Sequence, residues 1–278
     1  MTRFLKKIAL LVGGVAVAFS GVLAGSPAQA TEQVDVELVL AVDVSGSMSK
    51  RELRIQREGY TAAFRSNQVI DAIEAGLIGA IAVTYVEWAG KDLQRHVIPW
   101  MKIENAADAH AFADKLERAP RGNMNYTSIS GAIHVAMSSL DNNRYDGMRK
   151  VIDVSGDGLN NQGGLASFAR DEAVAKGIVI NGLPLMTDPF NFRFGGQEVS
   201  LDDYYQSCVI GGPGSFLIPV TSWNGFADAV RRKIIMEVAF ITPPRDNRRL
   251  PVVRAQFLDF GPPPVDCGIG EKVLGLPT

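Results

Sequence analysis

The sequence contains few residues of the types that build cysteine-rich or histidine-rich sites. Of its 278 residues, only Cys208 and Cys267 are cysteines and only His96, His110 and His134 are histidines. Two cysteines exclude a disulfide-dense scaffold and a cysteine-rich zinc module. The three histidines share no spacing typical of metal ligands, so we interpret them as surface or packing residues.

The sequence also lacks an excess of positive charge. Residues 1–30 hold three of the 28 basic residues and none of the 30 acidic ones, so 25 basic and 30 acidic residues follow them. A mildly acidic chain exerts no general attraction on nucleic acid or on anionic membranes. We therefore expect no nucleic-acid partner.

Beyond residue 30 no hydrophobic run reaches the length of about 20 residues that spans a bilayer. Before it, three basic residues precede the apolar segment 8–23, and Ala28-Gln29-Ala30 follows that segment. This order is typical of a secretory signal peptide that is cleaved after residue 30. An uncleaved anchor is the alternative, which the A-x-A sequence disfavours. We predict an exported protein, periplasmic or secreted, with no stable membrane anchor after cleavage.

The predicted export would place the two cysteines in an oxidising compartment. It permits a disulfide between Cys208 and Cys267, and two separate thiols are an equally open alternative.

Five apolar runs bounded by turns lack the alternation of half-buried strands, as is typical of strands buried on both faces. Segments with helical periodicity lie between them. This alternation predicts an α/β fold with a doubly wound, mainly parallel sheet flanked by helices. The expected strands are 37–42, 77–86, 150–154, 177–185 and 215–220, with an edge strand at 94–100. The expected helices are 49–64, 106–116, 128–140, 165–176 and one that begins near Ser222.

Proline changes the pattern near the C-terminus. Half of the fourteen prolines lie within residues 243–278. Such a segment cannot continue the alternation of strands and helices. We predict one domain at 31–241, followed by an extended proline-rich tail at 242–278.

Oxygen-bearing side chains gather in three segments beside expected strand ends and helix starts. The first is Asp43-Val44-Ser45-Gly46-Ser47, directly after the first expected strand. The second is Gly122-Asn123-Met124-Asn125-Tyr126-Thr127-Ser128, before the helix expected at 128–140. The third is Gly156-Asp157-Gly158, followed by Leu159-Asn160-Asn161. In open α/β sheets, ligands collect at the carboxyl ends of the strands, so we expect these segments to meet.

Together the three segments resemble the von Willebrand factor A domain with its metal-ion-dependent adhesion site. That family has D-x-S-x-S after the first strand, a threonine in a second loop and an aspartate in a third. The matching residues here are Asp43, Ser45, Ser47, Thr127 and Asp157. The resemblance covers roughly residues 35–240, and the phrases VTYVEWAG, INGLPL and YYQSCVIGGPGSF resemble a bacterial branch of exported proteins of unknown function. It implies a bound Mg²⁺, or Mn²⁺ or Ca²⁺, and a protein partner that binds through a carboxylate.

The chemistry of these side chains agrees with that implication. Hydroxyl and carboxylate oxygens are hard donors that suit Mg²⁺. Because only two of the five side chains are carboxylates, the cation would keep positive charge and accept one more oxygen from a partner. A hydrolytic metal site would add a general base beside an activated water, and the motif contains none. A metal-dependent binding module without catalysis is therefore favoured.

The main enzymatic alternative is the S-x-x-K sequence Ser47-Met48-Ser49-Lys50, which is the nucleophile motif of penicillin-binding enzymes. Such an enzyme also needs a K-T-G or K-S-G strand, and no lysine here is followed by either pair. An exported hydrolase that uses Ser47 and Lys50, or the same metal loops, remains the alternative. Ser49 is better explained as the cap of the following helix.

Three further groups of charged residues have structural interpretations. Asp153 lies inside an apolar strand and must be paired if it is buried. Glu87 is interpreted as an ordinary loop carboxylate in preference to a support of the site. Arg231-Arg232-Lys233 is interpreted as a solvated stripe on the last helix.

Overall fold

The structure is a computed structural model that describes residues 31–122, 124–187, 192–194, 197–239, 265–273 and 275. The predicted signal peptide and most of the predicted tail lie outside these residues. Among the helices of the described residues, none is long and apolar enough to cross a membrane.

Five strands of the described chain form one sheet, in the order β3-β2-β1-β4-β5. β1 pairs in parallel with β2 and β4, and β4 with β5, while β3 is an antiparallel edge strand. The predicted mainly parallel sheet is confirmed. The strands of the sheet are β1 (Glu32–Asp43), β2 (Ile81–Trp88), β3 (Gln94–Ile103), β4 (Tyr145–Gly156) and β5 (Ile178–Pro184), and a separate pair consists of β6 (Phe192–Phe194) and β7 (Gln197–Val199).

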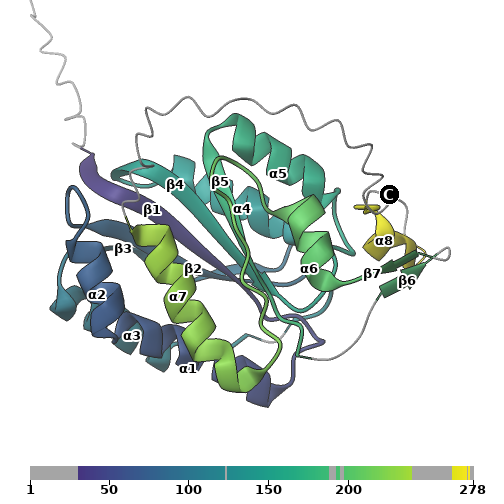
Figure 1. Ribbon diagram of the computed structural model, residues 1–278, viewed down its shortest axis with the longest axis horizontal. Helices are drawn as coiled ribbons and strands as arrows, with labels where there is room; N and C mark the ends of the chain where they lie inside the picture. The colour runs from purple at the N-terminus through teal and green to yellow at the C-terminus, as the bar shows by residue number, and fades with distance from the viewer. Residues whose placement is uncertain are drawn as a thin grey trace, which may run out of the picture. The chain divides into compact units, whose positions relative to one another are not determined.

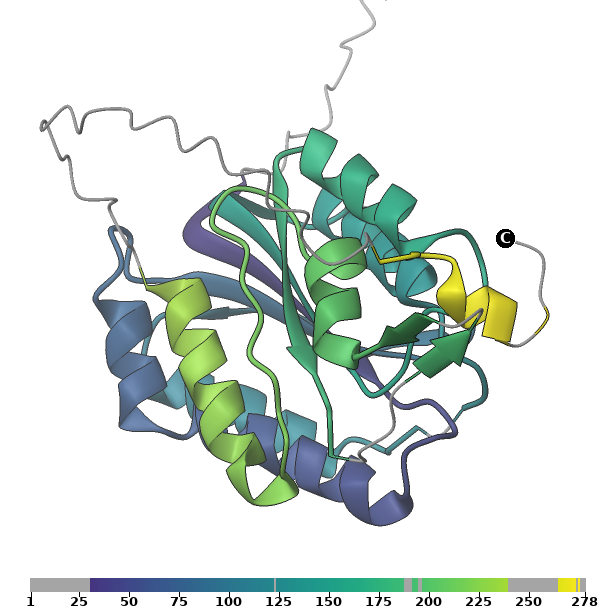
Figure 2. The same cartoon turned by 45° about the vertical axis from the view of Figure 1, so that its right-hand side comes forward.

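Helices cover both faces of the sheet, with α1, α2, α3 and α7 on one face and α4, α5 and α6 on the other (Figure 1, Figure 2). Successive residues of β1 point to opposite faces, which gives the sheet two cores. Leu38 and Leu40 belong to the core under α1 and α7, and Val39 and Ala41 to the core under α4 and α5. The helices are α1 (Lys50–Phe64), α2 (Asn67–Glu74), α3 (Ala106–Arg118), α4 (Ile129–Asp141), α5 (Ala166–Ala175), α6 (Leu201–Tyr204), the π-helix η1 (Tyr205–Val209), the 3₁₀ turn η2 (Trp223–Gly225), α7 (Phe226–Val238) and α8 (Ile269–Val273).

Two expected strands are shortened or interrupted in the structure. The strand expected at 77–86 begins only at Ile81, because the N–H groups of residues 78–80 donate to the carboxylate of Asp35 instead of to a neighbouring strand. The segment 215–220 is not a full strand and makes two isolated parallel bridges, from Leu217 to Gly182 of β5 and from Val220 to Leu185, which directly follows β5. The gap between those bridges includes Pro219, which has no N–H to donate.

Serine side chains cap several helices at their N-termini. Ser49 accepts a hydrogen bond from the N–H of Glu52 at 3.3 Å, and the Glu52 carboxylate accepts one from the N–H of Ser49 at 2.8 Å. This capping box confirms the predicted role of Ser49. Ser222 caps η2, so α7 itself begins at Phe226. The short helix α2 was not predicted.

The C-terminal residues 265–273 are attached to the domain. Cys208 and Cys267 form a disulfide, which decides between the two alternatives. Ile269 of α8 is 1% exposed, within the core under α4 and α5. This part of the predicted tail contains a short helix and is not extended.

Candidate metal site

The ends of β1 and β4 bring the first and third predicted segments together. Asp43 is the last residue of β1, and Asp157 directly follows β4, the parallel neighbour of β1. Parallel strands deliver their carboxyl ends to one edge of a sheet, which is why the two aspartates meet.

Four of the five predicted ligands form one chain of hydrogen bonds. The N–H of Ser45 donates to Asp43 Oδ1 at 2.7 Å. The hydroxyl oxygens of Ser45 and Ser47 are 3.0 Å apart, and Ser47 donates to Asp157 Oδ1 at 2.7 Å. The oxygens of the first and third segments therefore face a common centre.

Thr127, the fifth predicted ligand, lies against the third segment. Its N–H donates to Asn161 Oδ1 at 2.9 Å, and its carbonyl accepts from the N–H of Asn161 at 2.8 Å. A Cβ on Gly158 would lie 3.6 Å from the Thr127 hydroxyl oxygen, which places that oxygen beside the Asp157 turn. The preceding residue, Tyr126, has a φ of 66° and a side chain that is 55% exposed.

Asparagine side chains hold the second and third segments together. Asn160 accepts through Oδ1 from the N–H of Ser130, in the first turn of α4. Its amide donates to Gly164 and, at 2.6 Å, to the carboxylate of Glu271 on α8. Asn160 and Asn161 stand just after the third segment in the sequence, but nothing in the sequence indicates these partners.

Asp43 is fully buried, and its second oxygen, Oδ2, has no hydrogen-bond partner in the described part of the chain. Burial, and then the charge of Asp157, raise the pKa of Asp43 well above its ordinary value. Two adjacent carboxylates in a region of low dielectric constant repel each other, and a divalent cation between them would remove that repulsion. The residues present therefore fit a hard divalent cation.

Histidine and cysteine take no part in this arrangement. Across the described ranges, no group of three or more His, Cys, Asp or Glu side chains is placed to hold a metal ion. The candidate ligands are instead three hydroxyls and two carboxylates, a set that suits Mg²⁺ better than zinc.

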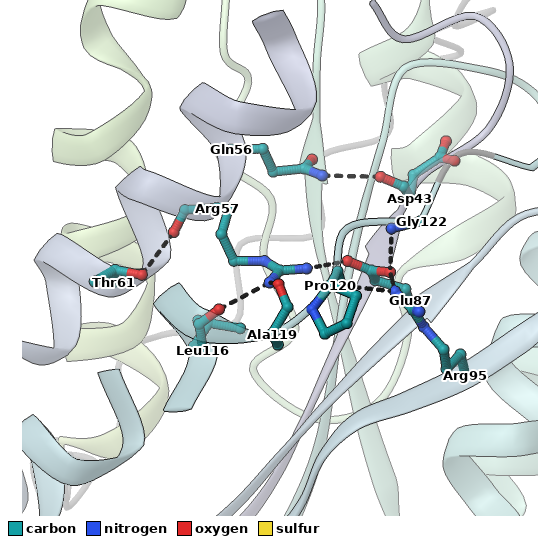
Figure 3. A network of polar contacts seen from close by, with 10 residues as sticks. All are labelled: Asp43, Gln56, Arg57, Thr61, Glu87, Arg95, Leu116, Ala119, Pro120 and Gly122. Carbon is teal, nitrogen blue, oxygen red and sulfur yellow. Dashed lines mark hydrogen bonds and ion pairs between the residues drawn. The ribbon is translucent and has the colours of Figure 1, made fainter. Parts of the chain in front are cut away.

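Glu87 is part of a buried ion network behind the site, so its interpretation as an ordinary loop carboxylate was wrong. Its side chain is 2% exposed and lies between Arg57 and Arg95, each of which donates to one of its oxygens (Figure 3). It also accepts from the N–H of Gly122 at 3.0 Å (Figure 3). Nearby, Gln56 donates to the carbonyl of Asp43 at 2.8 Å. Glu87 thus fixes the segment that leads to Thr127.

The serine and lysine of the S-x-x-K sequence do not interact. The Ser47 hydroxyl donates to Asp157, and Lys50 is exposed at the start of α1. In the described residues no contact joins these two side chains, so this lysine is not placed to activate the serine.

Tyr205, in η1, also lies at the site and was not predicted. Its side chain is fully buried, and burial followed by the charges of Asp43 and Asp157 raises its pKa well above the ordinary value. The hydroxyl therefore stays protonated at neutral pH. No periodicity marks this residue, because η1 is a single π-helical turn.

Comparison with other proteins places the chain among domains of one fold. A family model described as "protein of unknown function (DUF1194)" matches residues 33–242. The comparison with curated proteins gives no significant match.

Several solved structures share the fold. The pilus adhesin SpaC from Lactobacillus rhamnosus GG aligns with a TM-score of 0.56 and 13% identity, over 75% of this chain and 31% of that one. Proximal thread matrix protein 1 from the mussel byssus, with a zinc-occupied MIDAS motif, aligns with a TM-score of 0.50 and 14% identity, over 72% of this chain and 46% of that one. A von Willebrand factor type A protein from Catenulispora acidiphila aligns with a TM-score of 0.51 and 13% identity, over 74% of this chain and 43% of that one. The chain thus spans less than half of each of these proteins, and at such identities the likeness establishes the fold alone.

Proposed function

The chain belongs to the DUF1194 family and has the von Willebrand factor A fold, and we propose that its domain binds a divalent cation and, through it, a partner that carries a carboxylate. The ligands are Asp43, Ser45, Ser47, Thr127 and Asp157, and the preferred ion is Mg²⁺, with Mn²⁺ or Ca²⁺ as alternatives. The observation that carries this proposal is the chain of hydrogen bonds from Asp43 to Asp157, beside the unpartnered Asp43 Oδ2.

The ion would act as a fixed positive charge at the edge of the sheet. Three of its five protein ligands are neutral, so its charge is not fully neutralised, and a carboxylate of a protein partner can complete the coordination. Tyr126, exposed beside Thr127, lies at the rim of this surface. The adhesin and thread-protein relatives of the same fold favour a role in protein interaction.

We regard the domain as non-catalytic and exported. Among the residues that the structure describes, the five-residue motif supplies no general base beside the proposed ion, and Lys50 makes no hydrogen bond with Ser47. The predicted signal peptide implies a periplasmic or secreted location. A broad hydrolase screen that finds turnover dependent on Ser47 would establish the alternative instead.

Calorimetric titration of the domain with Mg²⁺ and Mn²⁺ tests the ligand set. Asp43→Ala and Asp157→Ala should each abolish binding, because each removes one of the two charged ligands. Asp171→Ala, on the exposed side of α5, is the matched control and should bind like the wild type. Unchanged titration curves for both site variants would disprove the assignment.

Metal-dependent capture tests the second half of the proposal. The immobilised domain is exposed to an extract of its native compartment in Mg²⁺, in EDTA, and as the Asp157→Ala variant. A partner of the proposed kind is retained by the wild type in Mg²⁺ and released by EDTA, and the variant fails to retain it. Retention that survives both EDTA and the substitution would show that binding does not pass through the ion.

A further inference from the structure

The ring of Tyr205 crosses the ends of two strands. A Cβ on Gly182 of β5 would lie 2.8 Å from Cδ1 of this ring, and a Cβ on Gly156 of β4 would lie 3.0 Å from its hydroxyl oxygen. A side chain at Gly182 would therefore collide with the ring, and one at Gly156 would crowd the Tyr205 hydroxyl and the Asp43 carboxylate. The two glycines leave the space in which the Tyr205 hydroxyl reaches the carboxyl edge of β4.

The hydroxyl of Tyr205 lies near the carboxylate of Asp43. The position where a Cβ on Gly156 would stand is 2.8 Å from Asp43 Oδ2, so this carboxylate oxygen and the phenol oxygen border the same small region. Both atoms are buried, and neither has a hydrogen-bond partner within the described residues. Buried polar atoms are nearly always paired, so two unpaired atoms around one region indicate a shared function.

We propose that Tyr205 is a positioning residue of the metal site, whose O–H donates to Asp43 Oδ2 through one bridging water and orients that carboxylate toward the ion. The inference rests on the proposed function. Ser45 already donates to Asp43 Oδ1, so a second donor at Oδ2 leaves the carboxylate a single orientation. Partners that hydrogen-bond to metal ligands commonly set ligand geometry and affinity in this way.

The chain offers a matched control in the preceding residue. Tyr204 is also fully buried, but its hydroxyl lies 3.4 Å from the carbonyl oxygen of Cys267, to which it donates. Tyr204→Phe and Tyr205→Phe therefore remove the same atom from neighbouring buried rings, and only the second variant alters the surroundings of Asp43.

Two measurements on the whole domain test the proposal. Tyr205→Phe should weaken Mn²⁺ binding by roughly 10- to 100-fold, and Tyr204→Phe should leave it unchanged. The thermal midpoint of the metal-free Tyr205→Phe protein should equal or exceed that of the wild type, because the lost hydroxyl makes no direct hydrogen bond to the protein in the described residues. The stabilisation that saturating Mn²⁺ adds should be smaller in Tyr205→Phe than in the wild type.

The outcomes separate this inference from the proposed function. If the wild type binds Mn²⁺ and Tyr205→Phe binds it equally well, the inference is wrong and the metal site stands. A lower metal-free midpoint with unchanged affinity assigns the hydroxyl a purely structural role and also overturns it. A wild type that binds neither Mg²⁺ nor Mn²⁺ overturns both.

A spectroscopic measurement decides the case if Tyr205→Phe does not fold. In a Tyr126→Phe background, which removes the exposed tyrosine beside Thr127, Mg²⁺ should perturb the near-ultraviolet absorption of a buried tyrosine. Absence of any tyrosine difference band upon Mg²⁺ binding would overturn the inference.

Discussion

Ser47 and Ser49 are two residues apart and have different tasks. Ser47 donates to Asp157 within the candidate site, and Ser49 accepts from the N–H of Glu52 at the start of α1. Ser49→Ala should lower the free energy of unfolding by about 1 kcal/mol, because it removes a helix cap. Denaturant titration measures that loss, and the Mn²⁺ affinity of the variant should remain that of the wild type.

Ser47→Ala is the complementary variant. The side chain is exposed and caps no helix, so its loss should reduce Mn²⁺ affinity with little change in the free energy of unfolding. If instead Ser49→Ala weakens metal binding as much as Ser47→Ala does, the division of roles between the two serines is wrong.

The candidate ligands could be predicted from the sequence, because they belong to short sequence patterns. Asp43 ends a strand, Thr127 lies just before a helix and Asp157 directly follows a strand, in the order that the family pattern requires. The supporting residues were not predictable in this way. Glu87 binds Arg57, which is 30 positions away in the sequence, and Tyr205 lies near Asp43, which belongs to the first strand, and no local spacing reports such contacts.

At the scale of elements, α7 is held to the sheet by buried charges. Lys233 is fully buried and pairs with Asp153 of β4 at 2.7 Å and with Glu237 one turn further along the helix. The prediction of a solvated stripe was therefore wrong for Lys233. Lys233 stands three residues after Val230 and therefore lies on the apolar face of the helix. This spacing was a better guide to its burial than the two arginines that precede it.

The buried cluster of Asp153, Lys233 and Glu237 predicts that the stability of the domain depends on pH. Burial, followed by the charge of Asp153, raises the pKa of Glu237 from its ordinary value of 4.5 to about 7. A carboxyl with a raised pKa in the folded state binds its proton more tightly there, so its contribution to stability is complete below pH 4.5 and is lost as the pH rises toward 7. Asp153, with its pKa also raised by burial, acts in the same direction.

Glu237→Gln isolates the contribution of this carboxyl. The glutamine cannot ionise, so the free energy of unfolding of the variant relative to the wild type should be higher at pH 8 than at pH 5. Denaturant unfolding of both proteins at the two pH values measures the difference. If the difference in free energy of unfolding between variant and wild type is the same at both pH values, Glu237 does not titrate in this range.

The strands and most helices could be predicted, because runs buried on both faces and helical periodicity are local signals. Elements that depend on distant contacts were missed. The segment 215–220 looks like a strand in isolation, and only its neighbour β5 shows that pairing is interrupted around Pro219. The short helices α2, α6 and α8 are too brief for a periodic pattern to identify.

At the scale of the whole molecule, the disulfide connects two elements that each reach the candidate site. Cys208 lies in η1, three residues after Tyr205, and Cys267 precedes α8, which carries Glu271. Glu271 accepts from Asn160, and Asn160 in turn accepts from the N–H of Ser130 at the start of α4. The bridge therefore holds the C-terminal segment against the loop that contains Asp157.

Reduction of this bridge should affect both stability and metal binding. The two cysteines are 59 residues apart, and loop-closure entropy for a loop of that length corresponds to a loss of about 4 kcal/mol in the free energy of unfolding. Because α8 would then lose its covalent attachment to η1, the Asp157 loop should loosen and the Mn²⁺ affinity should fall. Cys208→Ser/Cys267→Ser measured by denaturant unfolding and calorimetry tests both effects. Glu271→Gln, which keeps the bridge, should retain the stability conferred by the disulfide, and a double serine variant with wild-type stability and affinity would contradict the prediction.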